Sequence, residues 1–271
     1  MRIEKIVFDE NYPEVYLECL IADKTEKFTR KAILVIPGGG YRNVCSQREG
    51  EPIALAFMAR GYNAFILHYS VDRKKIFPAQ LIEASMAMKH IRDNAEDYGI
   101  DKDKVFAVGF SAGGHLCASL GAMWDMEEIY NEIDMPFGYN KPTGVILGYA
   151  AITANPAIAH RGSFKNLLGT DNPTDEELAM CSVENYVCEN SSPAFIMHTS
   201  DDETVDVRNS MILADAYVAA GQKVELHIYP SGHHGIALAN GITSEERPDH
   251  EDEMIEKWIE MADYWTKSVC E

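Results

Sequence analysis

The sequence lacks long apolar runs. No uninterrupted apolar stretch approaches the roughly 18–20 residues that a membrane-spanning helix needs, so we expect neither such a helix nor a membrane partner. The N-terminal residues read MRIEKIVFDE, and charges at Glu4, Lys5 and Asp9 interrupt any apolar region of a signal peptide. The chain as given is therefore expected to be cytoplasmic.

Positive charge is also scarce. Lys and Arg number 24 against 43 Asp and Glu, which gives a formal net charge of −19 at pH 7. A chain of this charge repels nucleic acids and anionic membranes, so neither is expected as a partner. Of the 271 residues, 46% are hydrophobic and 25% are charged, which is ordinary for a globular protein and excludes general disorder.

Cysteine is sparse and follows no pattern. The six cysteines form no C-x-x-C pair, and no metal-ligand spacing is present. We therefore expect reduced thiols, no metal and no cofactor. The composition leaves open whether the chain forms a homo-oligomer.

Apolar runs that suit strands alternate with helical patterns along the chain. Strands are expected at 32–37, 64–69, 105–110, 145–149, 194–198 and 224–229, with helices between and after them. This alternation predicts an α/β fold with a mostly parallel twisted sheet and helices on both faces. The length fits a single domain over 1–271. Residues 150–192 break the alternation with turn-forming residues, which predicts a small cap-like excursion over the strand ends.

The strongest motif is Gly109-Phe110-Ser111-Ala112-Gly113, which matches G-x-S-x-G. A strand is expected before it and a small-residue helix after it, as the motif requires. A serine on such a tight turn exposes its hydroxyl above the sheet edge, and the helix start behind it offers N–H groups to an oxyanion. We therefore predict Ser111 as the nucleophile and the N–H of Ala112 as an oxyanion donor.

A glycine loop, Pro37-Gly38-Gly39-Gly40-Tyr41, directly follows an earlier predicted strand. Acyl transfer needs N–H donors aimed at the tetrahedral oxygen, and bare glycine backbone can supply them. The loop precedes the serine motif in the chain, where an oxyanion loop belongs. We predict Gly39 and Gly40 as donors, with a plain turn as the alternative.

A nucleophilic serine needs a base, and the base needs a carboxylate to orient it. Downstream, one strand runs into Asp201 and Asp202, and the last strand runs into a loop that contains His233 and His234. The order serine, acid, histidine is that of the α/β-hydrolases. Spacing alone leaves both members of each pair as alternatives. A metal site made of the four residues is a rival interpretation that would leave the serine motif unexplained.

Three further histidines have ordinary structural interpretations. His198 occurs in an apolar strand and is typical of a core histidine. His115 follows the serine by one helical turn and is expected to pack beneath it. His160 lies in the excursion, where the sequence does not decide whether it approaches the pocket.

These segments together resemble the α/β-hydrolase esterases of the acetyl-esterase and acetyl-xylan-esterase type, near the lipase/esterase branch with an H-G-G-G loop. The resemblance covers nearly the whole chain and includes PGGGY, VFAVGFSAGGHLCASL, SPAFIMHTSDDETVDVRNS and VELHIYPSGHHGIAL. Its D-x-x-V register implies Asp202 as the acid, and its H-G register implies His234 as the base. The chain departs from the pattern at His233, where the family more often has a small residue, and at Pro37, where that branch usually has histidine.

The resemblance implies a serine esterase that removes acetyl groups from sugars or xylo-oligosaccharides, without a cofactor. Tyr41 and His233 are expected at the substrate-binding rim, with Tyr41, Trp124, Tyr149 and Phe164 as stacking surfaces for a sugar. A general short-chain carboxylesterase, or an arylformamidase-like or peptidase-like hydrolase, is the enzymatic alternative. A hydrolase fold kept as a binding module is the non-enzymatic one.

Overall fold

The structure is a computed structural model that describes residues 1–270. Residue 271, the last of the predicted domain, lies outside the described residues. The strands are β1 (Arg2–Val7), β2 (Tyr16–Ile21), β3 (Arg30–Ile36), β4 (Tyr62–His68), β5 (Ile100–Phe110), β6 (Val145–Gly148), β7 (Ala194–Thr199) and β8 (Val224–Tyr229). The α-helices are α1 (Ser46–Glu49), α2 (Glu51–Met58), α3 (Ala79–Asp93), α4 (Ala95–Tyr98), α5 (Ser111–Ala122), α6 (Glu127–Glu132), α7 (Arg161–Leu168), α8 (Asp175–Met180), α9 (Arg208–Ala219), α10 (Glu253–Glu256) and α11 (Trp258–Val269). Two 3₁₀-helices are η1 (Val183–Tyr186) and η2 (Pro248–His250).

Within the described residues the strands form one eight-stranded sheet with the order β1-β2-β4-β3-β5-β6-β7-β8. The strands from β3 to β8 pair in parallel, whereas β2 pairs antiparallel with both β1 and β4. The predicted α/β fold with a mostly parallel sheet is confirmed. The sequence patterns do not predict β1 and β2. The strand β1 is a largely exposed edge strand with three charges in RIEKIV, and β2 (YLECLI) has a glutamate within a mostly buried strand.

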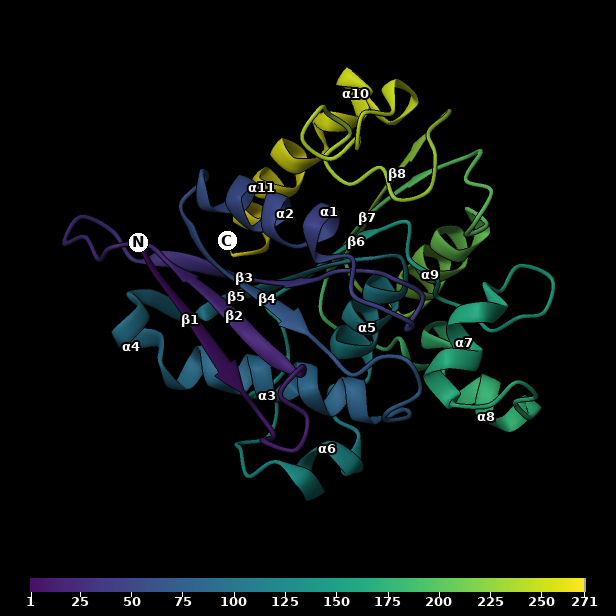
Figure 1. Ribbon diagram of the computed structural model, residues 1–271, viewed down its shortest axis with the longest axis horizontal. Helices are drawn as coiled ribbons and strands as arrows, with labels where there is room; N and C mark the ends of the chain where they lie inside the picture. The colour runs from purple at the N-terminus through teal and green to yellow at the C-terminus, as the bar shows by residue number, and fades with distance from the viewer. Residues whose placement is uncertain (271) are drawn as a thin grey trace.

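Helices cover both faces of the sheet, as Figure 1 shows for α2 and α11 on one side and α3 and α5 on the other. The alternation along β5 explains the two layers. Phe106, Val108 and Phe110 face a core that includes α2 and α11, whereas Val105 and Ala107 face a core that includes α3, α5 and α9. Among residues 1–270, no helix combines the length and the apolar character that crossing a bilayer requires.

The excursion at 150–192 contributes α7, α8 and η1 but no strand. Figure 1 shows α7 and α8 together beside α9. The side-chain amide of Asn166 on α7 donates to the carbonyl of Gly40 at 2.9 Å, and the carbonyl of Cys181 accepts from His115 on α5 at 2.7 Å. The excursion therefore contacts both the glycine loop and the helix that begins with Ser111.

The parallel strands bring four loops to one edge of the sheet. The glycine loop follows β3, Ser111 follows β5, Asp202 follows β7 and His234 follows β8. Because the carboxyl ends of parallel strands meet at the same edge, segments far apart in the chain become neighbours there. The fold thus assembles the predicted residues at one place.

We predict that Gly113→Ala destabilises the protein because the new methyl group would meet backbone. A Cβ at Gly113 would lie 2.2 Å from the carbonyl oxygen of Ile36 and 2.3 Å from that of Pro37. Overpacking of this kind costs about 1–3 kcal/mol, which urea unfolding measures. The control is Gly162→Ala on α7, whose Cβ would come no closer than 3.6 Å to its neighbours. Equal stabilities of the two variants would contradict this account.

Candidate active site

Ser111 occupies a strained turn between β5 and α5. Its φ is +53°, in the left-handed region that non-glycine residues rarely adopt. The glycine loop lies directly against this turn, because a Cβ on Gly38 would be 2.9 Å from the Cβ of Ser111 and 2.7 Å from the carbonyl oxygen of Phe110. Only glycine permits this approach, so the G-x-S-x-G turn and the preceding glycine loop form one unit.

His234 bridges Ser111 and Asp202. Its Nε2 lies 2.8 Å from the Oγ of Ser111, and its Nδ1 lies 2.7 Å from the Oδ2 of Asp202. Since a carboxylate only accepts, Nδ1 carries the proton and donates it to Asp202, while Nε2 accepts from the serine hydroxyl. This arrangement leaves Nε2 able to take the proton of the serine.

The structure separates the two aspartates and the two histidines that spacing left as alternatives. Asp201 accepts the N–H of Gly232 at 2.8 Å and so supports the histidine loop from outside. His233 is exposed and pairs with Asp249 at 3.0 Å. His234 is the histidine that contacts Ser111, and Asp202 is the aspartate that contacts His234.

Asp202 is held by several donors within the protein. Its side chain is 0% exposed, and its Oδ1 accepts the N–H groups of Thr204 at 2.8 Å and Val205 at 2.9 Å. Burial alone would raise the pKa of Asp202, but hydrogen bonds from His198 and His234 outweigh it and hold the pKa below its usual range. The carboxyl group is therefore ionised at neutral pH and can stabilise a positively charged His234.

His198 is a further contact of Asp202. It is fully buried, and its Nε2 lies 3.2 Å from Oδ2 of Asp202 and 3.0 Å from the carbonyl of Val205. Both partners only accept, so Nε2 carries the proton and Nδ1 accepts from the hydroxyl of Ser210 at 2.8 Å. The apolar run around His198 predicts a core histidine, and the spacing H-x-x-x-D is the only sign in the sequence of its contact with Asp202.

The glycine loop leaves donors free beside Ser111. The N–H of Gly38 donates to Glu49 at 2.8 Å, whereas those of Gly39 and Gly40 make no hydrogen bond to the described residues. Both glycines have positive φ, at +130° and +64°. Ala112 is in the first turn of α5, where N–H groups have no partner within the helix. These three N–H groups are available to bind an oxyanion.

Glu49 is a residue of the site that sequence reasoning missed. It is 1% exposed, and its carboxylate accepts the N–H of Gly38 and, at 3.0 Å, the hydroxyl of Tyr149. The Tyr149 hydroxyl in turn accepts the N–H of Ala237 at 3.1 Å, and the tyrosine ring packs edge-on against His234 with centroids 5.0 Å apart. Glu49 therefore connects the glycine loop to the histidine loop.

The aromatic residues expected at the rim lie in the core instead. Tyr41 is 1% exposed, and its hydroxyl donates to Nδ1 of His115 at 2.8 Å. Burial lowers the pKa of His115 to about 4, so its ring is neutral and its Nε2–H donates to the excursion. Trp124, Tyr149 and Phe164 are also buried. This corrects the expectation of open stacking faces, because the rings are used in packing.

His160 of the excursion lies near the glycine loop. Its Nδ1 is 2.8 Å from the hydroxyl of Ser163, whose Oγ is close to Gly40. Burial lowers the pKa of His160, the charge of His234 lowers it further, and Asp202 opposes them. Through Ser163, His160 lies beside the glycine loop, and among the described residues no hydrogen bond joins its side chain to Ser111, Asp202 or His234.

Comparison with known proteins identifies relatives of this chain. The family model described as BD-FAE matches residues 18–217. The chain is 41% identical over 214 residues to endo-1,4-beta-xylanase B of Butyrivibrio fibrisolvens, covering 78% of this chain and 33% of that protein. It is 30% identical over 212 residues to an acetylxylan esterase of Xylanibacter ruminicola, covering 77% of this chain and 41% of that protein. The chain thus spans about a third to two fifths of these relatives.

A solved structure covers almost the whole fold. The acetyl ester-xyloside bifunctional hydrolase of Caldicellulosiruptor lactoaceticus superposes with a TM-score of 0.83 at 31% identity. The match covers 98% of this chain and 96% of that one. Such a likeness extends to the N-terminal strands and the C-terminal helix, beyond the residues that the family model matches.

Asp202 should link stability to acid pH. The pKa of an unfolded-state aspartate is about 3.9. When the folded-state pKa is lower, the ionised carboxyl group stabilises the fold at pH values above about 3.9. This contribution is lost as pH falls through the folded-state pKa. The stability difference between wild type and Asp202→Asn should therefore shrink as pH is lowered from about 5. Thermal unfolding across a pH series measures it, with the neighbouring Asp201→Asn as control. A difference that stays constant with pH would refute this linkage.

Glu49→Gln should slow the reaction of Ser111 with a fluorophosphonate probe. The side-chain amide of this variant has a single acceptor oxygen, so its NH₂ group would face one of two donors, the N–H of Gly38 or the hydroxyl of Tyr149, and the link between the glycine loop and Tyr149 would be broken. We expect the labelling rate to fall about tenfold or more, equivalent to about 1.4 kcal/mol. The control is Glu51→Gln, an exposed glutamate two residues away. Unchanged labelling of a folded Glu49→Gln protein would contradict the proposed connection.

Proposed function

The chain belongs to the BD-FAE family and has the α/β-hydrolase fold, and on that basis we propose that it is a serine carboxylic-ester hydrolase that removes acetyl groups from acetylated sugars or xylo-oligosaccharides. The observation that carries the proposal is the hydrogen-bonded row of Ser111, His234 and Asp202. A protein that only binds ligands has no need of all three groups in this order, so the row argues against the binding-module alternative.

The first half of the reaction forms an acyl-enzyme. The Oγ of Ser111 attacks the ester carbonyl while Nε2 of His234 takes its proton. Asp202 keeps the imidazole oriented and stabilises the imidazolium that forms. The N–H groups of Gly39, Gly40 and Ala112 bind the tetrahedral oxyanion. Collapse of this intermediate breaks the bond to the alcohol oxygen, and His234 gives its proton to the leaving alcohol.

The second half releases the acid. Water enters where the alcohol left, and Nε2 of His234 removes a proton as the water oxygen attacks the acyl carbon of the ester on Ser111. The same N–H donors bind the second oxyanion. When the bond to Oγ breaks, His234 protonates the serine, which regenerates the starting arrangement and releases acetic acid, which then loses its proton to water and becomes acetate.

The names of two similar proteins support sugar esters as the substrates. One curated relative is named an acetylxylan esterase, and the superposed structure is named an acetyl ester-xyloside hydrolase. The net charge of −19 suits a neutral ester and an anionic product that is repelled after release. This charge does not by itself select a sugar.

A general short-chain carboxylesterase is the second candidate. The observation that favours it is the burial of Tyr41, Trp124, Tyr149 and Phe164, which leaves none of these rings exposed for stacking on a sugar. Sugar recognition would then depend on polar groups, among them His160 beside the glycine loop.

A panel of acyl substrates tests the proposal. We expect acetate release from acetylated xylo-oligosaccharides and hydrolysis of p-nitrophenyl acetate, with activity falling as the acyl chain lengthens. Loss of the nucleophile in Ser111→Ala should lower turnover by about 10⁴-fold or more. The control is Ser119→Ala, a buried serine on the same helix whose hydroxyl donates to the backbone of its own helix.

Each measurement has an outcome that would contradict part of the proposal. Preference for long acyl chains would contradict acetyl esters as substrates. Rapid hydrolysis of p-nitrophenyl acetate without acetate release from the oligosaccharides would favour the general carboxylesterase. Wild-type activity in Ser111→Ala would contradict the serine mechanism itself.

A further inference from the structure

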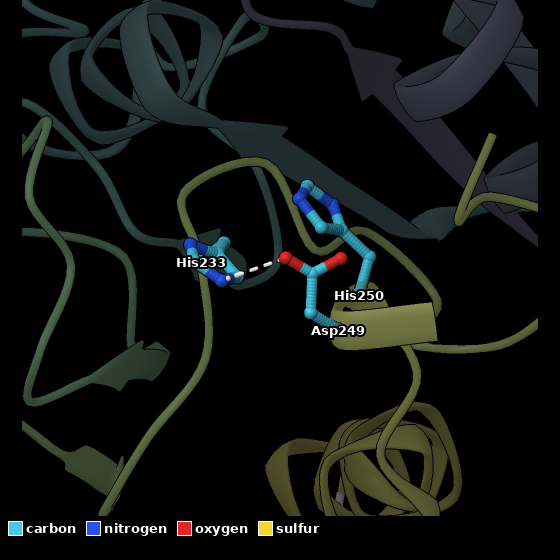
Figure 2. Close-up of side chains that lie close together, drawn as sticks. All are labelled: His233, Asp249 and His250. Carbon is cyan, nitrogen blue, oxygen red and sulfur yellow. Dashed lines mark ion pairs between the residues drawn. The ribbon is translucent and has the colours of Figure 1, made fainter. Parts of the chain in front are cut away.

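A second cluster of histidine and carboxylate side chains lies beside the histidine loop. It consists of His233, Asp249 and His250, and one ligand atom from each lies within 4.8 Å of the others. Figure 2 shows the side chains of His233 and Asp249 pointing toward each other, with the ring of His250 alongside. The proposed hydrolysis uses none of the three.

The fold brings the three residues together from two segments. His233 is in the loop after β8, whereas Asp249 and His250 belong to the 3₁₀-helix η2. The N–H of His250 donates to the carbonyl of Arg247 at 2.9 Å, which holds this short helix in shape. Direct contact between the segments consists of the His233–Asp249 pair at 3.0 Å and the stacking of the two imidazoles, with centroids 5.3 Å apart.

His250 is buried without satisfying its ring. It is 4% exposed, yet its side chain makes no hydrogen bond to the described residues, and its buried Nδ1 has no partner among them. A buried polar atom without a partner costs free energy that a ligand could recover. Stacking on His233 covers a face of the ring but does not engage its nitrogens. The ring thus retains a lone pair for a ligand from outside the chain.

The donor set suits one class of ion. Two imidazoles and one carboxylate are ligands typical of Zn²⁺ and related transition metals, whereas Mg²⁺ and Ca²⁺ prefer oxygen ligands alone. A tetrahedral zinc about 2.0–2.2 Å from each ligand would hold them roughly 3.3–3.6 Å apart. His233 and Asp249 have side chains that are 55% and 59% exposed, so both have room to change rotamer and bring their ligand atoms closer to His250.

The charges around the cluster are compatible with a cation. Two arginines lie in the surroundings of the cluster: Arg247 directly precedes η2, and Arg48 lies against the histidine loop at Gly235. Glu245 pairs with both, at 3.7 Å from Arg48 and 2.5 Å from Arg247. Asp249 adds a further negative charge, and the whole chain carries −19. The two arginines are therefore offset, and the long-range field attracts cations.

We propose that His233, Asp249 and His250 bind one divalent transition-metal ion of the zinc class, with water completing its coordination. The ion fastens the loop after β8 to η2. Because His233 directly precedes His234, the bound ion restrains the loop that contains His234. The site is separate from the proposed ester hydrolysis, and its binding can be measured without any substrate.

The test is metal binding and stability of the whole protein after removal of metals with EDTA and dialysis. We expect ZnCl₂ to bind with a stoichiometry of one in titration calorimetry and to raise the unfolding temperature, whereas MgCl₂ does neither. His233→Ala and Asp249→Asn should each weaken zinc binding at least tenfold. Both changes are at exposed side chains, so the variants should remain folded.

A matched control is His227→Ala. His227 also pairs with a carboxylate, since its Nε2 lies 2.7 Å from Oε1 of Glu225, but this pair is outside the cluster that offers three ligands. We expect its loss to leave zinc affinity unchanged. Absence of zinc binding in the wild type, or binding that His233→Ala and Asp249→Asn leave intact, would overturn the proposal. Equal weakening by His227→Ala would overturn it too.

Discussion

The hydrogen bond from Nδ1 of His234 to the buried carboxylate of Asp202 is the interaction on which the rest of the site depends. It places the imidazole proton on Nδ1, so Nε2 presents its lone pair to the hydroxyl of Ser111. It also joins the loop after β7 to the loop after β8, two strands that pair in parallel over their whole length. The pairing of β7 with β8 therefore fixes the position of His234 relative to Asp202.

Two buried carboxylates organise the loops at this edge of the sheet. Burying a carboxylate is costly unless its oxygens are hydrogen-bonded. Asp202 satisfies its oxygens with His234, His198 and two backbone N–H groups, and Glu49 with the glycine loop and Tyr149. In each case some donors come from segments far apart in the chain. The requirement to satisfy a buried charge therefore holds the nucleophile, the base and the oxyanion donors in one arrangement.

The sequence predicted the strands that lead to the site. It did not predict the edge strand β1 or which aromatic side chains are exposed. The strands before Ser111 and Asp202 are strongly apolar, so their pattern is clear. The edge strand β1 (RIEKIV) carries three charges, two of them adjacent, so it shows neither an apolar run nor a regular alternation. Tyr41 was expected at the rim as a stacking surface for a sugar, but its ring is buried and its hydroxyl bonds to His115. Where a side chain points depends on the packing of the excursion, which local sequence does not encode.

The sequence by itself determined the local geometry around Ser111 and the order of the three reacting groups. Glycines at 38, 109 and 113 are needed because the backbone is close-packed there, so these positions can be recognised from the sequence alone. Spacing alone left Asp201 and Asp202 as alternatives, the family resemblance implied Asp202, and the tertiary structure shows the contact between Asp202 and His234. It alone brought Glu49 under the glycine loop and His233 beside Asp249 and His250. These contacts join residues from separate loops, and their partners are set by how strands and helices pack in three dimensions.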